Sequence, residues 1–276
     1  MGQSVFAEAN VAVITGAAMG IGRAAAIRCA ELGMSVCLAD LGGEDLNEAQ
    51  AATIAAAPTG SDAVLACATD VGEFEQLQAL ASQVGDRFGP PQFLMNNAVT
   101  RIGREKPVDL GKWRRAMDVN FWGVVQGVEA FRTSMVAANK PARIVNVGSK
   151  QGITNPPGNT IYNTCKAAVK HYTEALEHEL RNENGGDISA HLLIPGWTTT
   201  GKSEHKQGAW LPRQVVDFMI EAVNAGSFYI LCPDDEVSPD MDQRRVHWAA
   251  GDITENRPPL SRWHPDFKEI AAKACN

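Results

Sequence analysis

Short apolar runs alternate with longer helical patterns along most of this 276-residue chain. Several of the runs are almost continuously apolar, as expected for strands that are covered on both faces. The predicted strands span 11–15, 35–40, 63–68, 93–96, 143–148, 188–194 and 228–232. The predicted helices lie near 20–33, 44–57, 73–88, 109–139 and 160–184. Because parallel strands need crossover helices, this order predicts an α/β fold, a doubly wound, Rossmann-like parallel sheet of about seven strands.

The alternation of strands and helices ends near residue 232. No internal repeat, low-complexity tract or linker precedes that point, so residues 1–232 are predicted to form a single domain. Residues 233–276 form a C-terminal extension with an acidic, turn-rich start, a short helical pattern in DQRRVHWAAG and a terminal helix in DFKEIAAKA. We expect this extension to pack on the domain, to cover a substrate cleft or to contact another subunit, and the sequence leaves these alternatives open.

Composition argues against several classes of protein. The net charge of −7 disfavours a nucleic-acid surface, which would be basic. No apolar run is long enough to span a bilayer, and the N-terminus lacks the pattern of a signal peptide. The six cysteines are scattered without a C-x-x-C pair, and the histidines lack metal-ligand spacing. We therefore expect buried thiols in a cytoplasmic protein with no metal, membrane or nucleic-acid partner.

A glycine-rich turn, TGAAMGIG at 15–22, follows the first predicted strand. Gly16, Gly20 and Gly22 would let the backbone approach a pyrophosphate, and the next helix would offer free N–H groups and the positive end of its dipole. The spacing is G-x-x-x-G-x-G, not the common G-x-G-x-x-G, and tight packing at a strand–helix turn is the structural alternative. Its position directly after the first strand favours dinucleotide binding.

Two aspartates close the next two predicted strands. Asp40 lies 18 residues past Gly22, where a carboxylate can accept hydrogen bonds from a ribose 2′-OH and would repel a 2′-phosphate. No Arg or Lys follows directly, since the next residue is Leu41 and two glycines come after it, so the sequence favours NAD over NADP. Asp70 and Val71 are interpreted as an adenine contact. The alternative for both aspartates is that they cap the following helix.

Tyr162 and Lys166 are spaced i, i+4 in a helical pattern and would share one face. An ammonium group there favours the phenolate form of tyrosine. A tyrosine that titrates near ~10 needs a shift of about three pKa units, or ~4 kcal/mol, to act as a base near neutrality. A cation about 4 Å away in an effective dielectric of about 20 supplies roughly that free energy. The Y-x-x-x-K spacing is weak by itself, because chance produces it often.

With these motifs in order, the chain resembles the short-chain dehydrogenase/reductase family. The resemblance extends from about residue 10 to about residue 200 and includes the thirteen residues from Ser149 to Tyr162. Any one motif is weak, but their common order is highly specific. The motifs are TGAAMGIG at 15–22, Asp40, Asp70-Val71, Asn96-Asn97-Ala98, Asn120 within MDVNFWG, Ser149, YNTCK at 162–166 and Pro195-Gly196.

The resemblance implies hydride transfer between NAD(H) and a secondary alcohol or ketone, with Tyr162 as the general acid/base. Lys166 would support the phenolate and bond the nicotinamide ribose, and Ser149 would hold the substrate oxygen. Asn120 would interrupt its helix and hold a water that links Lys166 to solvent. The residues that the resemblance assigns to the cofactor are Gly16, Met19, Gly20, Ile21, Gly22, Asp40, Leu41, Asp70, Val71, Asn97, Ala98, Tyr162, Lys166, Pro195, Gly196, Thr198 and Thr200.

The chain departs from the family pattern at two places. Val99 follows Asn96-Asn97-Ala98 where the family usually has glycine, and valine tolerates a positive φ poorly. The long extension replaces a short glycine-rich tail that builds a tetramer in many members. A homo-oligomer is expected, and a dimer through the helices near 109–139 and 160–184 and a tetramer both stay open.

The segment 197–212 is predicted to form a mobile lid over the substrate. Its tryptophans suggest an apolar or aromatic small molecule, and Lys202, His205 and Lys206 could contact a carboxylate. The structural alternative is a charged loop with two packing tryptophans. The candidate substrate residues are Gln151, Asn155, Trp197 and Trp210, with Trp248 and Trp263 added if the extension folds back.

An alternative of a different class is a non-catalytic NAD(H)-binding sensor or regulatory protein on the same fold. The complete set of Asn120, Ser149, Tyr162 and Lys166 disfavours it, because a sensor needs no proton relay. An epimerase or dehydratase is disfavoured by the short region after residue 195, since the extended relatives with these activities usually carry a larger substrate domain.

Overall fold

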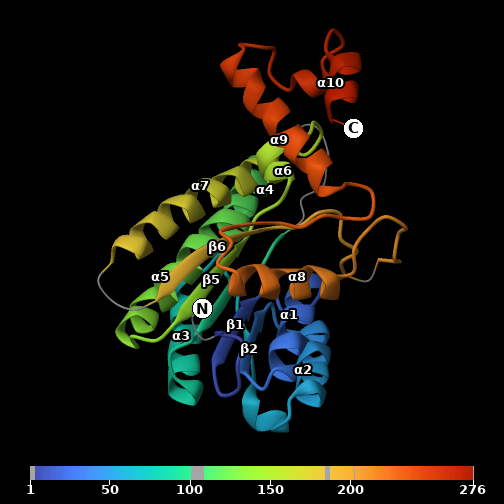
Figure 1. The fold of residues 1–276 in the computed structure, drawn as a ribbon. Helices are drawn as coiled ribbons and strands as arrows, with labels where there is room; N and C mark the ends of the chain where they lie inside the picture. Colours follow the sequence, from blue (N-terminus) through green and yellow to red (C-terminus); the bar gives the residue numbers. More distant parts are fainter. Residues whose placement is uncertain (1–3, 101–108, 184–186, 202, 276) are drawn as a thin grey trace.

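A computed structural model of the protein, which describes residues 4–100, 109–183, 187–201 and 203–275, contains one parallel sheet of seven strands. The strand order is β3-β2-β1-β4-β5-β6-β7, and this confirms the predicted doubly wound fold (Figure 1). The strands are β1 (Val11–Thr15), β2 (Ser35–Asp40), β3 (Val64–Ala68), β4 (Phe93–Asn96), β5 (Ala142–Val147), β6 (Ile188–Ile194) and β7 (Tyr229–Leu231). A short 3-10 turn, η1 (Gly60–Ala63), delays the third strand by one residue relative to the prediction.

Helices cover both faces of the sheet. On one face, α1 (Gly20–Glu31), α2 (Glu44–Ala56) and α8 (Pro212–Asn224) pack on an apolar cluster from β1 and β2. On the other face lie α3 (Phe74–Phe88), α5 (Gly123–Ala137) and α7 (Thr160–Asn182). Helix α8 was not predicted, although its buried residues Val215, Met219 and Val223 repeat every four positions, which is the spacing of one helix face.

The strand order places the functional motifs at one edge of the sheet. The chain leaves β1 toward β2 and leaves β4 toward β5, so neighbouring β1 and β4 form a topological switch point. Ligands of open α/β sheets bind in the crevice outside the carboxyl ends of the strands at such a point. The glycine-rich turn after Thr15, the segment after Asn96 and the turn after Val147 all begin at this edge.

The long helix predicted over 109–139 is divided into two α-helices. Helix α4 (Leu110–Met117) passes into a π-helical turn, η2 (Asp118–Trp122), and this turn passes into α5. Asn120 lies at the centre of η2 and is 1 % exposed. Single π turns within helices concentrate at functional sites, and this turn faces α7, which carries Tyr162 and Lys166.

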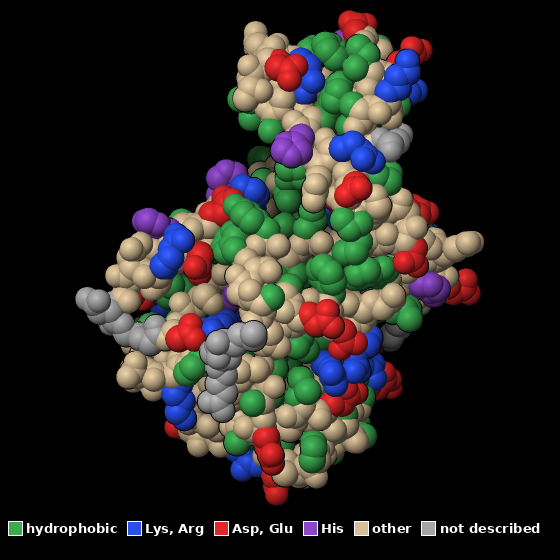
Figure 2. All heavy atoms as spheres, viewed as in Figure 1, with side chains coloured by type: hydrophobic (Ala, Val, Ile, Leu, Met, Phe, Trp, Pro, Cys, Tyr) green, Lys and Arg blue, Asp and Glu red, His purple; other side chains and the backbone are tan. Residues whose placement is uncertain are grey.

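The C-terminal extension stands away from the sheet (Figures 1 and 2). It contains α9 (Pro239–Thr254), a 3-10 turn η3 (Ser261–Trp263) and α10 (Lys268–Cys275). Helix α9 is longer than predicted, because Ser238 caps it and Pro239 occupies its first turn. It packs against α6 (Gln151–Thr154), the short helix that follows Ser149. None of the helices in the described part of the chain is long and apolar enough to cross a membrane.

Candidate active site

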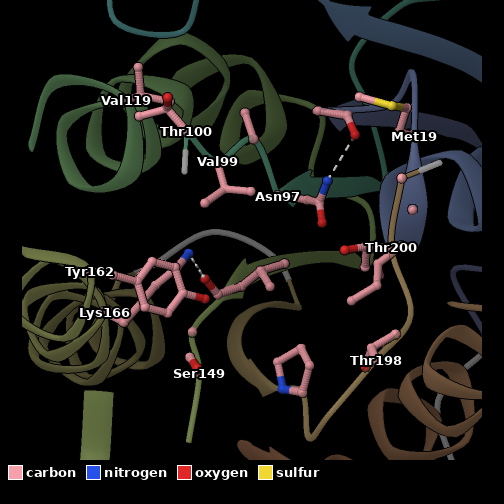
Figure 3. A pocket seen from close by; sticks show the side chains of 18 of the residues that line it. Met19, Asn97, Val99, Thr100, Val119, Ser149, Tyr162, Lys166, Thr198 and Thr200 are labelled. Atoms are coloured by element: carbon pink, nitrogen blue, oxygen red, sulfur yellow. Dashed lines mark hydrogen bonds between the residues drawn. The ribbon is translucent and has the colours of Figure 1, made fainter. Parts of the chain in front are cut away.

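A cavity of about 1010 Å³ opens at the carboxyl edge of the sheet (Figure 3). Tyr162, Lys166 and Ser149 lie on one side of it, and Met19, Thr198 and Thr200 lie across from them. Most of the residues singled out from the sequence line this cavity. They are Gly16, Met19, Gly20, Ile21, Asp40, Leu41, Asp70, Val71, Asn97, Ala98, Val99, Ser149, Gln151, Tyr162, Lys166, Pro195, Gly196, Trp197, Thr198, Thr200 and Lys206.

The glycine-rich turn forms a cradle that a larger residue would fill. Gly16 has a φ of +66°, and a Cβ added there would lie 2.6 Å from Ala98 Cα. A Cβ on Gly22 would lie 2.2 Å from Gly16 O, so Gly22 serves tight packing and does not line the cavity. Met19 makes no side-chain capping bond, and the first turn of α1 contains no acidic residue. The free N–H groups there fit a pyrophosphate, which is what a dinucleotide would require.

Thr15 and Asn97 join the glycine-rich turn to the end of β4. Thr15 Oγ1 accepts the backbone N–H groups of Asn97 at 3.0 Å and Ala98 at 3.2 Å. The Asn97 side chain donates to Thr15 O and Gly16 O, each at 3.0 Å. Thr15 was not predicted from the sequence to have a role, although its position between a buried strand and the first glycine is the signal for one. These bonds fix the shape of the cradle.

Asp40 stabilises the same turn through hydrogen bonds. Its carboxylate accepts Ala18 N–H at 2.8 Å and Leu41 N–H at 2.7 Å. It does not cap α2, because Gly43 is the N-cap residue of that helix and no side chain caps it. A carboxylate offers about four acceptor positions, so two such bonds leave capacity for hydroxyl groups of a ribose.

Asp70 lies in a polar pair with Arg115 at the same edge. Its carboxylate accepts Arg115 Nη2 at 2.7 Å and Gly72 N–H at 2.9 Å. Burial by itself would raise the pKa of Asp70, but the hydrogen bonds from Arg115 and Gly72 outweigh burial and hold that pKa below its usual value. The capping alternative fails here too, since Glu73 is the N-cap residue of α3. Arg115 lines the cavity but was not singled out from the sequence.

Tyr162 and Lys166 occupy adjacent turns of α7 and both line the cavity. The Lys166 side chain is buried at 3 % exposure, and its Nζ lies 5.8 Å from the centre of the Tyr162 ring. Nζ donates to Val147 O at 2.6 Å, so the end of β5 holds the ammonium group beside the tyrosine. Burial lowers the pKa of Lys166 to about 8. The group therefore still carries most of its charge at pH 7.

Ser149 and Asn120 complete the candidate set from β5 and η2. Ser149 Oγ accepts Gln151 N–H at 3.2 Å, and this bond sets the hydroxyl at the cavity wall. Asn120 does not line the cavity. Its Oδ1 accepts Thr100 N–H at 2.7 Å, and its Nδ2 donates to Thr100 O at 3.1 Å. Because the side-chain amide is engaged by Thr100, the expected water-holding role stays a hypothesis.

Comparison with known proteins decides the family. Residues 10–209 match the family model described as short chain dehydrogenase, and this stretch contains the cavity motifs. The protein belongs to the short-chain dehydrogenase family. Over 174 residues the chain is 37 % identical to SadH of Mycobacterium tuberculosis, which is named as an oxidoreductase, and the match covers 63 % of this chain and 61 % of SadH. The chain thus spans about three fifths of the length of that relative.

A relative that matches almost end to end is 1-deoxy-11-beta-hydroxypentalenate dehydrogenase of Streptomyces exfoliatus, 28 % identical over 93 % of this chain and 94 % of its own. A short-chain dehydrogenase/reductase from Burkholderia phymatum, solved with NAD, shares the fold with a TM-score of 0.80. It is 30 % identical and covers 93 % of this chain and 98 % of its own. A metagenomic short-chain oxidoreductase solved with NADP shares only the fold, at 23 % identity and a TM-score of 0.69 over 82 % of this chain and 98 % of its own.

In this short-chain dehydrogenase, a buried ion cluster ties the segment after β6 to Ser149. Lys150 Nζ lies 2.6 Å from Asp242 Oδ2 on α9 and 3.4 Å from Asp234 Oδ2. Asp234 Oδ2 also accepts the N–H of Trp197 at 2.9 Å. The two aspartate side chains are 3 % and 6 % exposed, so solvent screens the cluster little. This cluster was not predicted from the sequence, because the only local signal for it is that Lys150 directly follows Ser149.

Two candidate substrate residues lie elsewhere. Trp210 stacks edge-on against Phe218, with ring centres 5.8 Å apart, and its Nε1 donates to Asp235. Trp210 does not line the cavity and has the packing role of the structural alternative, whereas Trp197 lines the cavity, and its contact with substrate stays a prediction. Asn155 ends α6 in a left-handed conformation and lines a second cavity instead. Its Oδ1 accepts from the Asn163 side chain at 3.0 Å, which anchors it away from the predicted cleft.

The structure also bears on the two tryptophans of the extension and on the valine that replaces the family glycine. Trp248 and Trp263 line the second cavity with Asn155, because the extension packs against α6, and none of its described residues lines the first cavity. Val99 is not among the described non-glycine residues with positive φ, so the missing family glycine causes no strain of that kind. Lys202 of the predicted lid lies outside the described residues.

Proposed function

We propose that this short-chain dehydrogenase transfers hydride between NAD(H) and a secondary alcohol or ketone. The observation that carries the proposal is the arrangement of Tyr162, Lys166 and Ser149 on one side of a cavity that has the glycine-rich cradle on the other (Figure 3). A phenol, a buried ammonium and a hydroxyl at one wall suit proton transfer to and from an oxygen. This arrangement favours an enzyme over a sensor.

The chain would hold the cofactor through groups that already face the cavity. The first N–H groups of α1 would take the pyrophosphate, Asp40 a ribose, and Lys166 the ribose next to the nicotinamide. Thr198 and Thr200 would hold the carboxamide. When bound, NAD supplies the hydride acceptor, and NADH supplies the donor.

The proton is the part of the reaction that this chain would handle itself. Tyr162 would take the proton from an alcohol during oxidation and return it to the oxygen during reduction. Lys166 keeps most of its charge at pH 7 and would favour the phenolate. The Ser149 hydroxyl would bond the substrate oxygen and stabilise the alkoxide character that develops there.

The substrate is expected to have an apolar or aromatic body. Trp197 lines the cavity and is 41 % exposed, so its indole is available to a ring. An NADH-fluorescence screen with secondary alcohols and ketones, including aromatic, steroid-like and carboxylated ones, tests the proposal. We expect turnover with at least one such pair. Tight NADH binding with no turnover in either direction would instead favour the sensor.

Asp40→Asn tests the preference for NAD. The proposal predicts that the wild-type protein prefers NAD, because the carboxylate repels a 2′-phosphate. The neutral amide keeps the size and one acceptor oxygen, so we expect the ratio of kcat/KM for NAD over NADP to fall about ten-fold or more. Parallel kinetics with both cofactors measure this ratio.

The neighbouring exposed carboxylate of Glu44, changed to glutamine, is the control, and it should leave the ratio unchanged. A wild-type protein that already prefers NADP would show that Asp40 does not select the cofactor.

A further inference from the structure

A second cavity, of about 360 Å³, lies between α6 and the C-terminal extension. Ile153, Thr154 and Asn155 form the wall on the α6 side, and the other lining residues belong to α9, to η3 and to the loop between them. Its volume suits a small organic molecule. Gln151, one turn earlier on α6, lines the first cavity, so the two cavities flank the same short helix.

The lining is rich in arginine. Arg245, Arg257 and Arg262 all contribute, and Asp252 is the only acidic residue among its described lining residues. Both carboxylate oxygens of Asp252 already have partners, because Oδ1 lies 3.1 Å from Arg257 Nε and Oδ2 accepts Ser261 N–H at 3.0 Å. Arg257 also donates to the backbone carbonyl of Trp248 at 2.6 Å. Arg257 and Asp252 therefore neutralise each other.

Arg245 and Arg262 are left without an anionic partner in direct contact. Neither makes a hydrogen bond or an ion pair with another described residue, and Arg245 Nε is buried with no partner. Burial, and then the charge of Arg245, lower the pKa of Arg262, so the two cations affect each other. Asp242 also acts on both electrostatically, but its carboxylate lies 2.6 Å from Lys150. Two like charges at one cavity are costly unless an anion binds them.

The same cavity offers indole rings. Arg257 lies 4.1 Å from the Trp248 ring centre, and Trp248 Nε1 donates to Ser261 Oγ at 2.8 Å, so both contacts fix the position of this ring. Trp263 is 38 % exposed, and Arg262 lies 5.0 Å from its ring centre. Together with Ile153, these rings provide apolar lining beside the two cations.

We propose that this cavity is a binding site for a small organic anion, a carboxylate or a phosphate ester on an apolar or aromatic body. The guanidinium groups of Arg245 and Arg262 hold the negative charge, and Trp248 and Trp263 contact the body. Arginine suits this task, because its planar group donates two parallel hydrogen bonds to either anion. The site goes beyond the proposed dehydrogenase function and does not depend on it.

Isothermal titration with three matched probes tests the site: naphthoate, naphthyl phosphate and the uncharged naphthyl methanol. We expect at least one anionic probe to bind the wild-type protein about ten-fold more tightly than the alcohol does. Whichever of the two anionic probes binds more tightly shows whether the site takes a carboxylate or a phosphate ester. The double variant Arg245→Gln/Arg262→Gln should weaken that anion about ten-fold or more.

Arg244→Gln is the matched control, because it removes the same charge from the same helix at an exposed position that does not line the cavity. It should keep the affinity, and saturating NADH should not displace the probe. If the double variant does not fold, the single variant Arg262→Gln and the NADH competition still test whether the second cavity binds the anion. Unchanged affinity after loss of the arginines, equal binding of the alcohol, displacement by NADH, or no binding of either anion would overturn the proposal.

Discussion

Tyr162→Phe should retain NADH binding while turnover falls by about 10²–10⁴-fold, the usual contribution of a general acid or base. The substitution removes only the hydroxyl that would carry the proton. The aromatic ring stays in place, with Lys166 Nζ 5.8 Å from the ring centre, and Lys166 keeps its hydrogen bond to Val147 O. Cofactor affinity from NADH fluorescence and steady-state turnover with the best substrate from the screen separate the two effects.

Tyr172→Phe is the matched control for this variant. Tyr172 lies on the same helix and does not line the first cavity, and its buried hydroxyl has no hydrogen-bond partner among the described residues. Its removal should leave turnover unchanged and should not lower the free energy of unfolding. Turnover of Tyr162→Phe close to that of the wild-type protein would refute the catalytic assignment, even with the dehydrogenase fold intact.

Lys166→Met should cost turnover by orders of magnitude and at the same time stabilise the fold. The ammonium is buried, and its pKa falls from the ordinary 10.5 to about 8. That shift corresponds to about 3 kcal/mol of destabilisation at pH 7, where the charge is held in the interior. Losing the charge-assisted hydrogen bond to Val147 O costs about 2 kcal/mol in return. The net expected gain in the free energy of unfolding is roughly 1 kcal/mol.

The sign of the pH dependence follows from the lowered pKa. Between about pH 8 and pH 10.5 the unfolded chain binds this proton and the folded protein does not, so the free energy of unfolding of the wild-type protein increases with pH. The methionine variant lacks this gain. The difference in free energy of unfolding between the methionine variant and the wild-type protein should therefore be largest below pH 8 and should shrink as pH rises toward 10.

Urea titrations of both proteins at several pH values measure this difference. Lys170→Met, one turn further along α7 at a part-exposed pair with Glu174, controls for the change of residue type. An advantage that is absent at pH 7, or that grows above pH 8, would show that burial of Lys166 is not costly. Such a result would leave the loss of turnover to be explained without a tuned ammonium group.

Local sequence patterns were sufficient to predict the sheet, most of the crossover helices and the cavity-lining motifs. Each of these depends on residues that are near one another in the chain, such as the glycines of 15–22 or the four-residue spacing of Tyr162 and Lys166. The parallel topology then brings the carboxyl ends of the strands to one edge, because all seven strands run in the same direction. The family pattern added the order of the motifs, and the match over residues 10–209 confirmed it.

The tertiary structure alone decided where the later residues lie. Trp197 and Trp210 belong to one predicted lid, yet one lines the first cavity and the other packs on Phe218 of α8. The extension packs against α6, which buries Asp242 beside Lys150 and places two unpaired arginines at a second cavity. No local period encodes the contacts of the extension, because they join segments about ninety residues apart. Their free energy comes from packing and charge burial that exist only after the chain has folded.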